Sequence, residues 1–248
     1  MNRSVLIIAT LFVTTLANAQ QSSTSKPDTS SEYYKIVQTL TALSSDPESS
    51  MYYPKLALIF CHFDSSVNEK YLPIMLYGFK RTAAYGNKAA LLDSLNIIKQ
   101  LNNDQKYREA EIIARKLFLS YPFSCQLIEL LLNIYNNLDN QQMITKCNAK
   151  FAQLMLAFSK SGDGTLEFPR LQLFENDLSY YFKYYRCTII EDDKLVDLVN
   201  DINDPIKINS VRYKDMQGVD REMFFNVTDL FTRNFVYEIQ KQMKKKEN

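Results

Sequence analysis

Few side chains in this sequence have the types and spacing that catalysis needs, and the first to consider are Cys61 and His62. A thiol next to an imidazole can act as a nucleophile with its general base. His62 is the only histidine in the 248 residues. Adjacent residues of a helix point about 100° apart, so these two side chains would not face each other. We therefore interpret Cys61 as a buried thiol and His62 as a residue on the polar side of an apolar helix.

The densest group of carboxylates raises two other possibilities, a Ca²⁺ site or the acid pair of a glycosidase. It comprises Glu191, Asp192, Asp193, Asp197, Asp201 and Asp204. A Ca²⁺ loop needs a glycine at its sixth position, and no glycine lies between Gly164 and Gly218. We expect instead a helix from Asp193 to Ile202, whose first turn is stabilised by the negative charges.

Glycine and histidine are too scarce for several common catalytic motifs. The chain has five glycines, and two of them form the turn Gly162-Asp163-Gly164. Glu167 stands where the last glycine of a G-x-G-x-x-G loop would lie, so we interpret this turn as a domain junction. Histidine metal clusters and His-dependent triads lack their residues too. We predict no catalytic residue, no cofactor and no metal site, which favours a protein that is not an enzyme.

Tyrosine is the one residue type used lavishly, with 16 copies, and most of these side chains are expected to lie in the core. In a helix predicted at 175–186, Tyr181 and Tyr185 fall on an apolar arc of about 100°. The candidate interaction surface lies outside that arc and consists of Tyr180, Lys183 and Tyr184. It would face a partner or the other region of the chain, because tyrosine supplies large contact area at low entropic cost.

The first 19 residues have the three parts of a secretory signal peptide. Arg3 supplies the positive charge, Val5 to Leu16 the apolar run, and Ala17-Asn18-Ala19 the small residues of a cleavage site. This run is too short to span a bilayer, and no later segment has the required length and hydropathy. We predict cleavage after Ala19 and a soluble protein that is secreted or periplasmic. Residues 20–31, rich in Ser and Thr, are predicted to be a flexible leader.

The charge balance argues against nucleic acid as a partner. Removal of the signal peptide removes Arg3, which leaves 28 basic and 28 acidic side chains and a formal net charge of zero. Binding to nucleic acid calls for a clear basic excess. The basic cluster Lys244-Lys245-Lys246 is interpreted as the last turn of a C-terminal helix, where cations offset the helix dipole.

Residues 32–160 have apolar side chains at helical spacing. Four of their segments are expected to form two antiparallel hairpins: 88–101, 105–120, 124–138 and 143–160. The links within the two hairpins lie 36 residues apart, at 103–107 and 139–143. Because Ala110, Ala114 and Pro122 are spaced as in a tetratricopeptide repeat, the hairpins resemble that repeat.

Residues 161–248 are expected to form a small α+β region. Its elements would be a short strand, a helix and an antiparallel hairpin of two strands: Leu171–Phe174, Glu175–Arg186, Ile206–Tyr213 and Glu222–Val227. A final helix from Asp229 carries an apolar stripe that would cover one face of the sheet. The predicted fold class is therefore mostly α, with repeat-like helical hairpins followed by a small α+β region that has a short antiparallel sheet.

Several short motifs occur in an order that is typical of one family. They are Tyr52-Tyr53-Pro54-Lys55-Leu56, Phe63-Asp64, Tyr77-Gly78-Phe79, Gly162-Asp163-Gly164 and Phe225-Asn226-Val227. In their order, over nearly the whole mature chain, the sequence resembles domain-of-unknown-function family 4919, which comprises uncharacterised exported bacterial proteins. The resemblance implies export and the architecture above. It implies no catalytic residue, because the family has no assigned activity.

These observations favour an exported soluble protein that acts as a non-enzymatic protein-interaction module of the periplasm or cell envelope. Its partner would be an unknown protein or peptide, bound in a groove of the helical hairpins and the α+β region. The alternative is an extracytoplasmic hydrolase that uses paired carboxylates. Two inward-facing carboxylates at the bottom of one deep cleft would favour the hydrolase.

Overall fold

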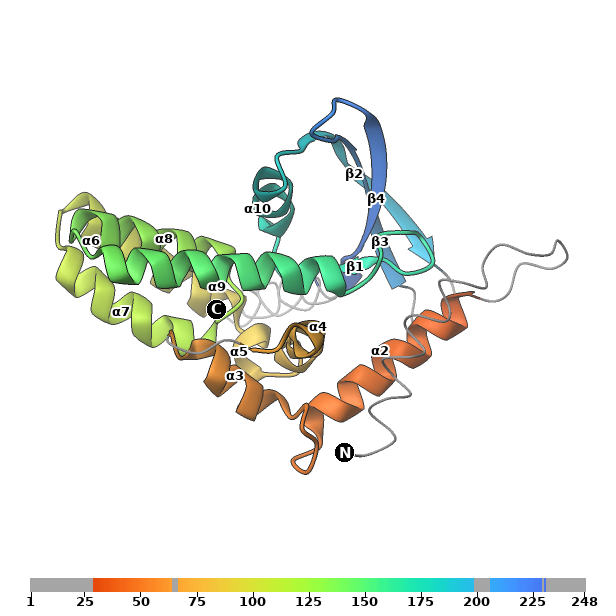
Figure 1. Ribbon diagram of the computed structural model, residues 1–248, viewed down its shortest axis with the longest axis horizontal. Helices are drawn as coiled ribbons and strands as arrows, with labels where there is room; N and C mark the ends of the chain where they lie inside the picture. Colours follow the sequence, from red (N-terminus) through yellow and green to blue (C-terminus); the bar gives the residue numbers. More distant parts are fainter. Residues whose placement is uncertain (1–28, 64–66, 199–205, 229, 231–248) are drawn as a thin grey trace, which may run out of the picture.

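The computed structural model describes residues 29–63, 67–198, 206–228 and 230. A long run of helices comes first and a small sheet follows, with one helix between its first two strands (Figure 1). The helices are α2 (Thr29–Ser45), α3 (Tyr53–Cys61), the 3₁₀ turn η1 (Glu69–Tyr71), α4 (Leu72–Phe79), α5 (Ala83–Gly86), α6 (Lys88–Asn103), α7 (Tyr107–Ser120), α8 (Cys125–Asn137), α9 (Gln141–Lys160) and α10 (Asp177–Tyr184). The strands are β1 (Arg170–Leu171), β2 (Thr188–Leu198), β3 (Ile206–Lys214) and β4 (Asp220–Asn226). The predicted fold class is confirmed.

The four central helices form the two predicted hairpins, α6–α7 and α8–α9, and α7 packs on α8 (Figure 1). Polar residues in the breaks cap three of the helices. Asn87, Ser124 and Asn140 each accept a hydrogen bond from the backbone N–H three residues further on, at 3.2, 3.3 and 3.1 Å. Such caps satisfy N–H groups that have no partner inside the helix, so the asparagine-rich breaks fix where the helices begin.

The turns within the two hairpins share one geometry. Gln105 and Asp139 have positive φ angles of 57° and 52°. In both turns the next backbone N–H donates to the carbonyl five residues earlier, at 2.8 and 2.9 Å, which satisfies an orphan carbonyl of the helix end. Because the equivalent residues 105 and 139 lie 34 positions apart, the predicted spacing of 36 is corrected to 34.

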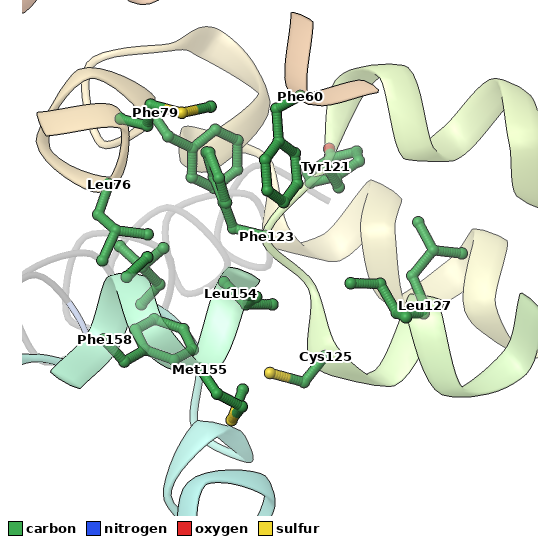
Figure 2. Packing of buried hydrophobic residues seen from close by; sticks show 14 of the residues in the cluster. Phe60, Leu76, Phe79, Tyr121, Phe123, Cys125, Leu127, Leu154, Met155 and Phe158 are labelled. Atoms are coloured by element: carbon green, nitrogen blue, oxygen red, sulfur yellow. The ribbon is translucent and has the colours of Figure 1, made fainter. Parts of the chain in front are cut away.

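The link between the hairpins, residues 121–124, is buried in the centre of the helical region. Helix α7 ends at Ser120, two positions before Pro122. This end was predicted, because the residue before a proline avoids the helical conformation. The ring of Phe123 lies between those of Phe60 and Phe79, with centroid distances of 5.2 and 5.3 Å (Figure 2). The two hairpins are therefore joined through the core rather than over the surface.

The sheet has the strand order β1-β4-β3-β2. Strands β2 and β4 are antiparallel to β3, as the predicted hairpin of β3 and β4 requires. Strand β1 is parallel to β4, with Arg170 opposite Phe225, so the sheet is mixed rather than purely antiparallel. The strand predicted at 171–174 is thus shorter and begins one residue earlier.

The helix predicted from Asp193 to Ile202 is wrong, because residues 188–198 form the edge strand β2. Its pairing with β3 has two irregularities, between Ile189 and Glu191 and between Glu191 and Lys194. Bulges of this kind interrupt the alternation of polar and apolar residues that identifies a strand. The expectation that these carboxylates occupy a helical N-terminal turn is wrong for the same reason. Residues 199–205 lie outside the described residues.

Helices α10 and α2 pack on opposite faces of the sheet. On one face, the ring of Phe182 in α10 lies 4.8 Å from that of Tyr213. On the other, Tyr33 of α2 packs with Ile206 and Ile208, and its hydroxyl accepts a hydrogen bond of 3.0 Å from Asn226 Nδ2. Residues 208 and 213 point to opposite faces since they are an odd number of positions apart on one strand.

Some predicted segments fall outside the described ranges. They are the signal peptide, most of the leader and nearly all of the final helix from Asp229. Within the described ranges, the helices lack the combination of length and hydropathy that crossing a bilayer requires.

Candidate functional site

The short helix α10 is attached to the helical region by polar groups from α8. The Tyr180 hydroxyl donates a hydrogen bond of 2.5 Å to Glu129 Oε2. One helical turn earlier on both helices, the Asp177 carboxyl group bonds with the Cys125 thiol. We call these four residues the α8–α10 contact. It joins the two halves of the molecule at the place where the sequence predicted an interaction or inter-region surface.

Asp177 is the first residue of α10 and is almost completely enclosed, with 4% of its surface exposed. Its Oδ2 accepts backbone hydrogen bonds from Leu173 at 3.0 Å and from Phe174 at 2.8 Å. Burial raises the pKa of Asp177 to about 7, although these hydrogen bonds, the Cys125 thiol and Lys88 favour the charged form. Burial, followed by the neighbouring Asp177, also raises the pKa of the Cys125 thiol well above its usual value.

In the candidate surface Tyr180, Lys183 and Tyr184, the two tyrosines lie around Phe151 of α9. Both tyrosine rings meet the Phe151 ring edge to face, at centroid distances of 6.2 and 5.8 Å. Tyr180 is half-buried by its contact with Glu129, whereas Tyr184 is 42% exposed and Lys183 is exposed. Tyr180 therefore makes an inter-region contact, and Tyr184 and Lys183 lie at its solvent-facing rim.

Tyr181 of α10 and Tyr185, the residue directly after this helix, face inward, as the helical phase predicted. Tyr181 is buried and Tyr185 is partly buried. Ser159 Oγ lies 3.2 Å from the hydroxyl of Tyr181 and 2.7 Å from that of Tyr185. Arg170 Nη1 also donates a hydrogen bond to the Tyr181 hydroxyl. This network ties α10 to the end of α9 and to β1.

Cys61 and His62 do not form a nucleophile–base pair. Cys61 is partly buried at the end of α3, and its Sγ donates to the carbonyl of Phe118 at 3.7 Å. Burial raises the pKa of Cys61 to about 11, against a smaller lowering by Lys150, so the thiolate needed for attack is disfavoured. His62 is exposed just beyond the helix end.

The acidic stretch and the glycine turn each include a residue with a structural contact, and Asp201 and Asp204 lie outside the described residues. Glu191 forms an exposed ion pair of 3.4 Å with Arg212 on the neighbouring strand. A Cβ on Gly162 would lie 2.4 Å from the Pro169 carbonyl oxygen, so only glycine fits this close approach. In the described part of the chain, no three His, Cys, Asp or Glu side chains are grouped closely enough to hold a metal ion.

Sequence reasoning missed two buried polar groups. Asp177 lies in the helix predicted at 175–186, and its partner Cys125 is distant in the sequence. Lys150 of α9 is 2% exposed, with its Nζ 5.0 Å from the ring centroid of Phe60. Lysine is almost never fully buried, so no local pattern predicts it at this position. Both groups become visible only through tertiary contacts.

Taken together, the described residues define a mostly α protein of packed helical hairpins, to which a small mixed sheet is joined through α10. Residues 38–169 match the family model described as domain of unknown function DUF4919, and the chain belongs to this family. The match begins within α2, covers the helices from α3 to α9 and ends at Pro169, so the Phe225-Asn226-Val227 motif lies beyond it. No curated protein and no solved structure matches the sequence.

Proposed function

We propose that the protein is an exported, non-enzymatic protein-interaction module of the periplasm or cell envelope. The observation that carries this proposal is the set of large apolar side chains on the outer surfaces of α3 and α7. Leu58 is 69% exposed on α3, and Ile112 and Leu119 are 70% and 64% exposed on α7. Ile112 and Leu119 are seven residues apart, which places them on one helix face.

These two helices contact each other. Phe63, just after α3, stacks on Phe118 of α7 at a centroid distance of 5.1 Å, and Cys61 bonds to the Phe118 carbonyl. Large apolar side chains exposed on neighbouring helices are typical of surfaces that bind another protein. We infer a protein partner with a complementary apolar surface.

The alternative, a hydrolase with paired carboxylates, finds little support among the described residues. The one carboxylate buried there, Asp177, faces a thiol rather than a second carboxylate. The crevice beside it is lined mainly by apolar side chains such as Phe158, Leu178 and Phe225, and it has no room for a water molecule. A glycosidase of the inverting type needs space for water between its acid and its base.

Co-purification tests the binding function. The form lacking residues 1–19 serves as bait in an envelope extract, beside the variants Ile112→Glu/Leu119→Glu on α7 and Leu92→Glu/Ile97→Glu on α6. The α6 residues are a matched control, because Leu92 and Ile97 are also large, apolar and more than half exposed. We expect a captured protein that is lost with the α7 variant and kept with the α6 variant. Equal capture by both variants, or capture of nothing specific, would contradict the proposal.

Export is tested separately by the mass of the protein recovered from expressing cells. We expect the mature chain to begin at Gln20, since the sequence places the cleavage site after Ala19. Recovery of the full chain with Met1 from the cytoplasm would contradict export but leave the binding experiment valid.

A further inference from the structure

Asp177 occupies a position that connects three parts of the molecule. It begins α10, its carboxylate fixes the link between β1 and α10 through the N–H groups of Leu173 and Phe174, and it contacts Cys125 at the start of α8. The link and α8 belong to different regions of the chain. Any change in the charge of this carboxyl group therefore acts on the junction between them.

The groups around Asp177 do not neutralise its charge well. On α8 its neighbour is the Cys125 thiol, and on α10 the charge of Asp177 acts on the Tyr180 phenol. Among the described residues, the cation that acts on Asp177 is Lys88 of α6, whose effect is the smallest of those that favour the ionised form. A carboxylate enclosed to this degree, with a neutral thiol as its side-chain partner, is costly, whereas the neutral acid is not.

We propose that the Asp177 carboxyl group makes the α8–α10 contact pH-sensitive: the neutral acid holds α10 on α8, and ionisation weakens the attachment. The neutral group still accepts the backbone hydrogen bonds through its carbonyl oxygen. The ionised group gains hydration when α10 moves away from α8. This property is independent of the proposed binding function.

The direction of the effect follows from the pKa of Asp177, which burial raises to about 7 in the folded chain. When α10 is released, the group regains its usual pKa of about 4. The attached state binds the proton more tightly, so attachment is strongest in acid and weakens as the pH rises from about 4 to about 7. The released fraction rises by up to about tenfold per pH unit in this window and levels off above it.

Amide hydrogen exchange in the chain lacking residues 1–19 tests the proposal, with rates corrected for the intrinsic effect of pH. The reporters are the amides of residues 173–184, which include the two N–H groups bonded to Asp177. We expect the opening of this segment to increase from about pH 5 to pH 7 and to stay constant up to about pH 8. In Asp177→Asn, which keeps the acceptor but cannot ionise, opening should be low and independent of pH.

Asp93→Asn on α6 is the matched control, since Asp93 is exposed and should leave the pH profile unchanged. A profile that is flat in the unmodified chain, or unchanged in Asp177→Asn, would overturn the proposal. If Asp177→Asn does not fold, the pKa of Asp177 can be measured directly in the unmodified chain. Carboxyl ¹³C NMR of the unmodified chain should give a midpoint near 7 for Asp177, and a midpoint below about 5 would equally overturn it.

Discussion

The helical region and the α+β region are stabilised by different kinds of contact. The helical region is built around aromatic and aliphatic side chains, with Phe123 between Phe60 and Phe79 (Figure 2). Six of the nine polar residues buried in the described part of the chain lie instead in the shorter α+β region: Ser161, Gln172, Asp177, Asn209, Ser210 and Asn226. The two regions should therefore respond differently to substitution and to pH.

The difference follows from how much apolar surface each region can enclose. A hairpin of long helices buries a continuous stripe against its neighbours, and burial of apolar area is then the main stabilising contribution. A sheet with one two-residue strand, covered by the eight-residue α10 on one face and by α2 on the other, encloses less. Hydroxyl, carboxyl and amide groups are buried with it, and a buried polar group without a partner is costly. Packing stabilises the first region, and specific hydrogen bonds position the second.

The largest expected effect is in the helical core. Phe123→Ala removes a ring that contacts two others, and such changes in a core cost about 3 to 5 kcal/mol. Urea unfolding should show this loss in the free energy of unfolding with little dependence on pH. Leu119→Ala, on the exposed face of α7, is the control and should change stability by less than about 0.5 kcal/mol. A cost for Phe123→Ala below that of the control would show that the link does not lie in the core.

The next effect distinguishes the two faces of α10. Tyr181→Ala should cost about 3 kcal/mol, because it removes a buried ring together with a hydroxyl that Ser159 and Arg170 contact. The double change Tyr180→Ala/Tyr184→Ala should cost less, about 1 to 2 kcal/mol, mainly from the lost hydrogen bond to Glu129. Thermal unfolding of both variants measures which change lowers the stability more. The reverse order would show that the helical phase of α10 is wrong.

A smaller effect is expected at the junction of the two regions. Gly162→Ala places a Cβ 2.4 Å from a backbone carbonyl oxygen, and the main chain must shift to accept it, at a cost of about 1 to 3 kcal/mol. Gly218→Ala is a useful comparison, because φ is +78° there but no atom lies within 4 Å, so the cost is conformational strain alone, about 1 kcal/mol. Denaturant unfolding of both variants separates crowding from strain. Equal costs would mean that the close approach at Gly162 relaxes without penalty.

Local patterns predicted most of the helical region and only part of the rest. The helices at 88–160 could be placed from periodicity, polar breaks and Pro122, since each depends on nearby residues. Strand β2 was missed because its bulges and four consecutive charged residues, 191–194, hide the alternation. The contact of Asp177 with Cys125 depends on how two distant helices pack, which no local pattern encodes. The phase of α10 was predictable, but the role of Tyr180 in joining the regions was only one of two stated alternatives.

The parallel pairing of β1 with β4 has a consequence for how the chain is made. Strand β1 must wait for residues 225 and 226, and Tyr33 of α2 must wait for Asn226, 193 positions later, before either has its partner. The hairpins α6–α7 and α8–α9 need only neighbouring segments, so they can form while the ribosome is still adding residues. The sheet, and the contact of α2 with it, can therefore be completed only after residues 225 and 226 have been added, which is later than the helical hairpins and the packing of α2 on α4 require.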